Sequence, residues 1–387
     1  MNNSRSQPDG TLRRVAFLSS YPPRECGIAM FTKELAGSID ALGVFKPTVV
    51  IAENESGAIY HYDRRVKSII EQEIPEDYYE AAHYVNISDI DLVNIQHEFG
   101  LFGGDYGNYI LYLLDQIKKP IVTTLHTVQP DFNSKAISIL KKITEKSAAI
   151  VIITPIAKKI LDEQNISTEK CKVIPHGCPQ IKFVKTQQIK AQMNLRNKFI
   201  ISTFGLLSRG KGIEYVIQAM PSILEKEPNA IYLIIGETHP EVRKKEGEQY
   251  RNELITLKNE LELHNHVKFH NRFLTKRELV KYLQLTDVYV TPYNSPNQIS
   301  SGTLVYAVGA GKPVVSTPYL HALDVLGNGR GLFCKFKNPE SIANNVIKLM
   351  DDSLREEIRK RAFKYSRKFL WQNVAKSYAD LFREVMR

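Results

Sequence analysis

The chain has 387 residues, of which 43% are hydrophobic and 24% charged, and its formal net charge is +10. This length predicts about two domains, and the composition is typical of a well-packed globular protein. No apolar run reaches the roughly 18 residues that a membrane-spanning helix needs, and residues 1–12 are polar rather than a signal sequence, so we expect a cytoplasmic protein. Four widely spaced cysteines without a CxxC pair argue against a zinc site or a disulfide framework.

The excess of positive charge indicates an anionic partner. The basic residues are scattered, and they do not follow the aromatic and basic repeat of a nucleic-acid-binding module, so we do not expect a nucleic acid partner. A phosphate-bearing substrate fits better. Peripheral contact with an anionic inner membrane face is also consistent with this charge.

Short apolar runs alternate with helical patterns along the whole chain. Helices are predicted notably at residues 30–42, 110–117 and 137–146 of the first half. Strands are predicted there at residues 14–19, 48–52, 91–96, 121–125, 150–153 and 171–174. The second half repeats the scheme, with strands at residues 199–205, 230–236, 267–271, 288–293 and 314–316. Such alternation predicts two doubly wound α/β domains with parallel sheets.

The domain boundaries follow from composition. We predict a first domain at residues 1–180, a polar linker rich in Lys and Gln at 181–197, a second domain at 198–355 and C-terminal helices at 356–387. Ligands of open α/β sheets bind beyond the C-terminal ends of the strands, so we expect a site in a cleft between the two domains.

In the first half, several predicted strands end at residues suited to binding. The first strand runs into YPPRECGIAMF, where Gly27 permits a ligand to approach a helix N-terminus closely, although simple turn chemistry explains this loop equally well. His97 and Glu98 follow the third strand, and His126 follows the fourth. Two histidines at adjacent strand ends favour a functional role over a purely structural one.

In the second half, the loop FGLLSRGKG follows a strand. Gly205 allows a tight turn, while Arg209 and Lys211 offer cations to a phosphate, although the P-loop spacing is absent. The next strand ends at GETHPE, which places Glu237 and His239 at the same edge.

The stretch QISSGTLVYAVGAGKPVVSTP predicts a small-residue loop that opens a short helix. Ser300, Ser301, Gly302 and Thr303 lie where free backbone N–H groups and the helix dipole favour an anion. The Asp89-x-Asp91 pair precedes its strand and is more simply a solvated strand entry, so we expect no metal cofactor.

These features together resemble the retaining glycosyltransferases of the family-4 type, which have the GT-B fold of two Rossmann-like domains facing a central cleft. The resemblance rests on the YPPRxxGIA start, the strand-ending His126, GLLSRGKG and GKPVVST, and it covers nearly the whole chain. Residues 369–385 resemble the helix by which such enzymes cross back to the first domain. GETHPEV, FHNRF, VTPY and QISSGTLVYA resemble a bacterial branch associated with polysaccharide synthesis.

The resemblance implies roles for single residues. Lys211 would contact the donor diphosphate, Gly27 would let that phosphate approach the first domain, and His126 would contact the donor sugar. Ser301 to Thr303 would cap the pyrophosphate. His97 and Glu98 would lie on the acceptor side.

Two positions depart from the family pattern. The arginine that usually follows the loop glycine is Leu206 here, and Arg209 lies three residues later. Gln298 and Tyr306 replace the usual pair of glutamates. Tyr306 cannot offer the carboxylate that, in the family, accepts hydrogen bonds from both ribose hydroxyls of the nucleotide.

The expected activity is therefore transfer of a hexose, of mannose or glucose type, from a nucleoside diphosphate sugar to a saccharide or lipid-linked hydroxyl. Lys211 and Arg209 would stabilise the leaving diphosphate, and His126 would contact the sugar. Two alternatives stay open. One is a sugar-nucleotide epimerase or a sugar phosphorylase on the same fold, and the other is a non-catalytic sugar-nucleotide-binding protein.

Overall fold

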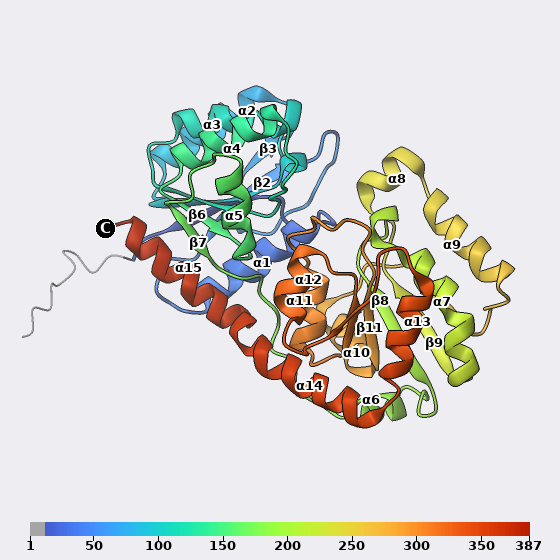
Figure 1. Cartoon of the computed structure of the whole chain (residues 1–387). Helices are drawn as coiled ribbons and strands as arrows, with labels where there is room; N and C mark the ends of the chain where they lie inside the picture. The colour runs from blue at the N-terminus through green and yellow to red at the C-terminus, as the bar shows by residue number, and fades with distance from the viewer. Residues whose placement is uncertain (1–11) are drawn as a thin grey trace, which may run out of the picture. The chain divides into compact units, whose positions relative to one another are not determined.

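The computed structural model describes residues 12–387 (Figure 1), which divide into two compact units. One unit holds the described residues up to Pro175 together with Trp371–Arg387, and the other holds His176–Leu370.

The first unit is built on a seven-stranded parallel sheet of order β3-β2-β1-β4-β5-β6-β7. Its strands are β1 Val15–Ser19, β2 Val49–Asn54, β3 Val66–Glu71, β4 Leu92–His97, β5 Ile121–Leu125, β6 Ala149–Ile152 and β7 Cys171–Val173. Its helices are α1 Gly27–Asp40, α2 Pro75–Ile87, α3 Ile110–Gln116, α4 Ser134–Lys146, α5 Ile156–Glu163 and α15 Trp371–Val385, with short 3₁₀ turns η1 Phe99–Leu101 and η2 Asp105–Gly107.

The second unit is built on a six-stranded parallel sheet of order β10-β9-β8-β11-β12-β13. Its strands are β8 Phe199–Phe204, β9 Ala230–Ile235, β10 Val267–His270, β11 Val288–Thr291, β12 Val314–Ser316 and β13 Leu332–Phe333. Its helices are α6 Thr186–Gln192, α7 Ile213–Lys226, α8 Pro240–Glu246, α9 Gln249–Glu260, α10 Lys276–Leu285, α11 Gly302–Gly309, α12 Leu320–Leu326, α13 Pro339–Lys348 and α14 Asp352–Ser366, with 3₁₀ turns η3 Arg209–Lys211 and η4 Arg367–Phe369.

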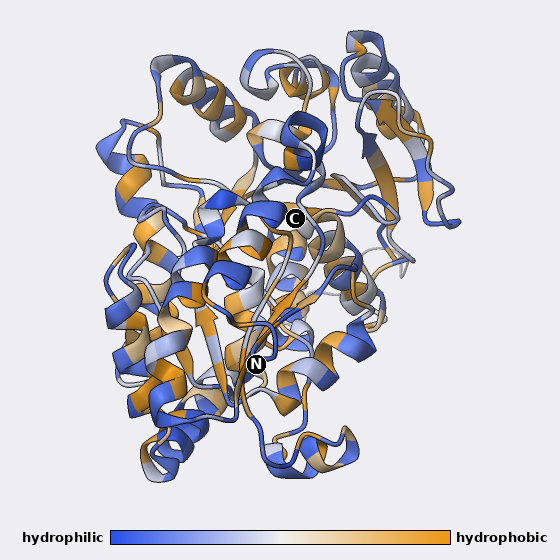
Figure 2. Cartoon of the chain, turned by 90° about the vertical axis from the view of Figure 1, so that its right-hand side faces the viewer, coloured by the Kyte–Doolittle hydropathy of each residue, from blue (hydrophilic) through white to orange (hydrophobic). Residues whose placement is uncertain are grey.

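Burial of the strands explains both sheets. Residues of β1, β4, β5, β8 and β9 are buried throughout, as expected for parallel strands covered by helices on both faces. Figure 2 shows the corresponding apolar colour along strands and mixed colour along helices. The prediction of two doubly wound Rossmann-like domains is confirmed.

The helix α15 belongs to the first unit although it lies at the end of the chain. Trp371 packs edge-on against Phe31 of α1, with ring centroids 5.1 Å apart, and the Tyr378 hydroxyl shares a 3.0 Å hydrogen bond with Thr124 of β5. Trp371, Val374 and Phe382 join the apolar core that contains β1. Burial of the apolar face of α15 therefore stabilises this unit.

Residues 181–197, expected to be a linker, lie within the second unit. They contain α6, Ile181 is buried, and the Lys190 ammonium forms a buried ion pair with Asp287. Part of the polar composition that suggested a linker is therefore Lys190, which is buried with Asp287.

Within residues 12–387, no helix combines the length and apolar character that crossing a membrane requires.

Candidate functional site

In each sheet the strand order reverses at one point. In the second unit the reversal lies between β8 and β11, the two strands from which the chain winds in opposite directions. Loops leaving the carboxyl ends of two such strands separate and form a binding crevice. Lys211 follows β8 and Tyr293 follows β11, so they flank this point.

The Lys211 ammonium lies over the ring of Tyr293, with Nζ 4.1 Å from the ring centroid. Tyr293 is 3% exposed and stacks on Tyr319 at a centroid distance of 5.0 Å. Its hydroxyl shares a 2.9 Å hydrogen bond with Thr303 Oγ1. The predicted cation is therefore joined to the start of α11 through a tyrosine that sequence analysis did not single out.

The N-terminus of α11 is capped by Ser301, whose Oγ accepts from the backbone N–H of Leu304 at 3.3 Å. The Ser301 N–H donates to Nδ1 of His321 at 2.7 Å. Gly302 and Thr303 are the first two residues of α11, so their N–H groups have no acceptor within the helix. These two N–H groups lie at a helix N-terminus, as the sequence predicted for an anion site, and the binding of an anion to them stays a prediction.

Two buried histidines support the start of α11. The His176 Nδ1 lies 2.7 Å from the carbonyl oxygen of Gly177, so Nδ1 carries the proton and Nε2 has the lone pair. A Cβ on Gly302 would lie 2.9 Å from this Nε2, which shows how closely the ring approaches the helix backbone. Burial lowers the pKa of His176 to about 4 and that of His321 to about 3. Both rings are therefore neutral at pH 7.

The predicted turn glycine, Gly205, has φ 128° and lies at the end of β8. A Cβ there would approach Thr303 Cγ2 to 3.2 Å. Gly236, at the end of β9, has φ 138°, and a Cβ on it would lie 2.1 Å from the carbonyl oxygen of Gly205. The backbones of the loops after β8 and β9 therefore approach each other so closely that position 236 must be glycine, which the sequence pattern did not reveal.

Arg209, expected to contact phosphate, is engaged by carboxylates instead. Its two terminal nitrogens donate to Glu253 at 2.6 and 2.7 Å, and its Nε donates to Glu246 at 3.4 Å. Hydrogen bonds from Arg209 to Glu253 raise the pKa of the guanidinium, so Arg209 is charged. Its role toward a diphosphate stays a prediction.

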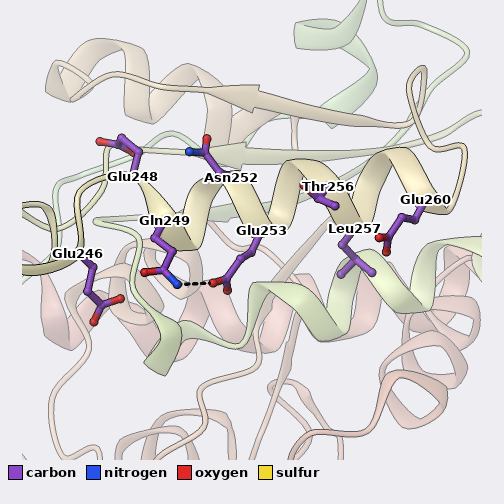
Figure 3. Close-up of a pocket in the computed structure, with 8 residues that line it drawn as sticks. All are labelled: Glu246, Glu248, Gln249, Asn252, Glu253, Thr256, Leu257 and Glu260. Atoms are coloured by element: carbon purple, nitrogen blue, oxygen red, sulfur yellow. Dashed lines mark hydrogen bonds between the residues drawn. The ribbon is translucent and has the colours of Figure 1, made fainter.

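The carboxylates that hold Arg209 belong to an open hollow along α9 (Figure 3). Four glutamates contribute to it, and Gln249 donates to Glu253 at 3.1 Å. The lining residues are Glu246, Glu248, Gln249, Asn252, Glu253, Thr256, Leu257 and Glu260. Because this surface is acidic, it repels a diphosphate, and we do not assign the donor to it.

Glu237 and His239 have structural partners in the loop after β9. Glu237 accepts from Arg243 at 3.3 Å and from the backbone N–H of Phe273 at 3.2 Å. His239 caps α8, because its Nδ1 accepts from the N–H of Glu241 at 3.2 Å. The structure places both residues at the predicted sheet edge.

The two positions that replace the usual glutamates lie on either side of the α11 start. Gln298 donates from Nε2 to the carbonyl oxygen of Ser300 at 2.6 Å, which orders the loop before the helix. Tyr306 packs edge-on against His176, with ring centroids 6.3 Å apart.

In the first unit, His126 is held by a chain of buried amides. Its Nε2 lies 2.8 Å from Gln96 Oε1, the Gln96 amide donates to Asn94 Oδ1, and Asn94 donates to the carbonyl oxygen of Val122 at 2.9 Å. The Gln96 amide group thus directs its oxygen at the ring, so Nε2 of His126 is the donor. Asn94 and Gln96 were missed, although two alternate polar residues in a strand expected to be buried on both faces are a signal for such a chain.

The two residues predicted to lie on the acceptor side differ in their surroundings. His97 is buried between Phe99 and Phe102, with centroid distances of 5.0 and 5.7 Å, and burial lowers its pKa to about 4. Glu98 accepts from the N–H of Phe99 at 3.1 Å and from the Thr127 hydroxyl, and burial raises its pKa. Glu98 therefore caps the start of η1, whereas neither ring nitrogen of His97 has a hydrogen-bond partner among the described residues.

Gly27 is the first residue of α1 and is exposed, and a Cβ built on it would meet nothing within 4 Å. No other residue therefore packs against this position, and contact of Gly27 with a donor phosphate stays a prediction.

The Asp89 and Asp91 pair serves the strand entry. Asp89 pairs with Arg14 and Lys46, both at 3.2 Å, and Asp91 accepts from the Arg14 N–H at 2.7 Å. Across the described part of the chain, no three His, Cys, Asp or Glu side chains gather as a metal site.

Comparison with known proteins finds similarity to glycosyltransferases. Residues 185–369 match the family model described as glycosyl transferases group 1. An uncharacterized glycosyltransferase of Methanocaldococcus jannaschii is 28% identical over 266 residues, which cover 66% of this chain and 65% of that protein.

Solved structures show the same architecture. Sucrose-phosphate synthase from Thermosynechococcus elongatus superposes with a TM-score of 0.79 at 17% identity, covering 96% of this chain and 99% of that one. HepE of Anabaena, in complex with UDP and glucose, gives a TM-score of 0.75 at 17% identity with the same coverage. The prediction of the GT-B fold is confirmed.

Proposed function

Because this chain belongs to the group 1 glycosyl transferases, we propose that it is a retaining enzyme that moves a hexose from a nucleoside diphosphate sugar to a hydroxyl acceptor. The acceptor in this proposal is a saccharide or a lipid-linked saccharide used in polysaccharide or glycoconjugate synthesis.

The observation that carries the proposal is the anion site of the second unit. Lys211 and the N–H groups of Gly302 and Thr303 are linked through Tyr293 at the point where the strand order reverses. A lysine and a helix N-terminus suit a diphosphate, which carries its charge on oxygens that accept hydrogen bonds.

This arrangement has a direct use in transfer. Cleavage of the bond between the sugar and the diphosphate leaves negative charge on the diphosphate, and Lys211 with the α11 N–H groups would stabilise that charge. We propose that His126 contacts the donor sugar, since the hydrogen bond between its Nε2 and Gln96 Oε1 fixes the orientation of its ring. Positioning and electrostatics then supply the catalysis.

We propose that this chemistry needs no metal ion, because Lys211 and the helix dipole supply the positive charge that a metal would otherwise bring. Turnover that is unchanged by a chelator would support this, and loss of turnover restored by a divalent cation would contradict it.

The first test is a panel of nucleoside diphosphate sugars in a thermal unfolding assay. A ligand that binds only the folded protein raises the melting temperature by mass action. UDP-glucose is the first donor to try, because UDP and glucose are bound in the HepE structure. A positive donor is then incubated with saccharide acceptors, and acceptor-dependent release of nucleoside diphosphate is measured. Binding without release would favour the non-catalytic alternative.

A further inference from the structure

Tyr293 is the group on which Lys211 and the first turn of α11 converge. Its ring lies beneath the Lys211 ammonium at 4.1 Å, and its hydroxyl contacts Thr303 Oγ1 at 2.9 Å and Ser301 Oγ at 3.4 Å. The orientation of the Tyr293 ring is fixed as well, because the ring stacks on that of Tyr319 with an interplanar angle of 16°. The side chain is 3% exposed, so this geometry is held by packing rather than by solvent.

We propose that Tyr293 is a positioning residue that holds Lys211 over the N-terminus of α11 and sets the charge that this site presents to a diphosphate. The inference rests on the proposed function, since it assigns a residue to the binding of the same donor. Tyr293 itself need not contact the reacting atoms.

The charge argument begins with the groups that face the phenol. They are Lys211 from η3, Ser301 and Thr303 from the start of α11, Tyr289 from β11 and Tyr319 from the segment before α12. Burial alone would raise the pKa of Tyr293, but the positive charge of Lys211 and hydrogen bonds from its neighbours outweigh burial and lower the pKa to about 8. Tyr289 and Tyr319 have raised pKa values and stay neutral.

Ionisation of Tyr293 would change what the site binds. Below pH 8 the phenol is neutral, so the positive charge of Lys211 is available to an anion. Above pH 8 the tyrosinate neutralises Lys211 and places negative charge beside the α11 N–H groups. Because a bound diphosphate favours the neutral phenol, affinity should fall by up to about tenfold per pH unit above the pKa.

The first experiment uses the free protein and needs no ligand. Tyrosinate absorbance in the near ultraviolet is followed during a pH titration. The wild-type protein should show a tyrosine that ionises near pH 8, which Tyr293→Phe should remove and Lys211→Met should move to higher pH. Tyr232→Phe is the control, because its buried hydroxyl contacts Thr203 and burial raises its pKa. A wild-type protein without this transition, or one that keeps it in Tyr293→Phe, would overturn the proposal.

The second experiment measures UDP binding by calorimetry between about pH 7 and pH 9.5. The wild-type affinity should fall above pH 8, and that of Tyr293→Phe should stay level because phenylalanine has no proton to lose. A fall of equal size in the variant would overturn the proposal. Absence of UDP binding at every pH would contradict the proposed donor, whereas the titration of the free protein would still decide on Tyr293 and Lys211.

Discussion

Substitution of Gly302 by alanine tests whether close packing of His176 fixes the anion site. The added Cβ would lie 2.9 Å from Nε2 and 3.0 Å from Cε1 of the His176 ring, both shorter than ordinary contacts. The ring cannot yield freely, because it is 8% exposed and its Nδ1 is 2.7 Å from the carbonyl oxygen of Gly177. Either the ring moves and strains this hydrogen bond, or the start of α11 moves.

The expected cost can be worked from this geometry. Overpacking of a close-packed site costs about 1–3 kcal/mol, and alanine in place of glycine in a helix returns at most about 1 kcal/mol. We expect Gly302→Ala to lower the free energy of unfolding by about 1–2 kcal/mol. For a unit of this size, that corresponds to a fall in melting temperature of about 2–8 °C. UDP affinity should fall as well, because the N–H groups of Gly302 and Thr303 are displaced.

The assay is a double-mutant cycle with His176→Ala, using thermal and urea unfolding. Removing the ring should abolish the cost of the added methyl group, so the two substitutions should be strongly coupled. Gly37→Ala is a matched control, because this exposed helix position has nothing within 4 Å of a built Cβ and should gain about 0.5–1 kcal/mol. The reasoning is refuted if Gly302→Ala costs the same with and without the His176 ring.

Three other predictions follow from single groups. Lys211→Ala should reduce turnover by about 10²-fold or more with an unchanged melting temperature, since it removes the cation from the leaving group, and normal turnover by the folded variant would exclude that role. Arg209→Ala should weaken UDP binding while Glu253→Gln should not, if the arginine serves the diphosphate; equal effects would show that only the ion pair matters. Burial, with Arg359 and Lys190 nearby, lowers the pKa of Lys312 to about 7. Between pH 7 and 9 the unfolded chain therefore binds more protons than the folded protein does. The free energy of unfolding should rise with pH over this range, by up to about 1.4 kcal/mol per pH unit. Urea unfolding at both pH values should show this rise reduced in Lys312→Met, and an equal rise would contradict the assignment.

The sequence predicted those parts of the fold that depend on local pattern. Strand β5 was predicted at its observed bounds, because an apolar run lies between a proline and a histidine. Strand β3 was not predicted, because it lies at a sheet edge where alternate residues are exposed and its Lys67 breaks the apolar run. Strand β13 has only two residues and leaves no pattern to read.

The candidate site divides in the same way. Lys211, Ser301 and Thr303 could be identified because each lies in a loop directly after a strand or at a helix start. Tyr293 and His321 could not, because their contacts depend on how separate strands align in the sheet. Arg209 shows a further limit of local pattern, because nothing near it in the sequence indicates that Glu253 of α9 pairs with it in space.

The charge of the anion site now depends on few groups. His176 and His321 are neutral at pH 7, so they shape the helix start without adding charge. Lys211 and the helix dipole therefore supply the positive potential, and a diphosphate has more negative charge than they offset. Arg209 is a candidate for offsetting the remaining negative charge. Its ion pair with Glu253 joins two exposed side chains and is therefore weak, so the guanidinium can exchange Glu253 for a phosphate. A site with so little fixed charge is sensitive to one further proton, which is why the ionisation of Tyr293 beside Lys211 should be visible in binding.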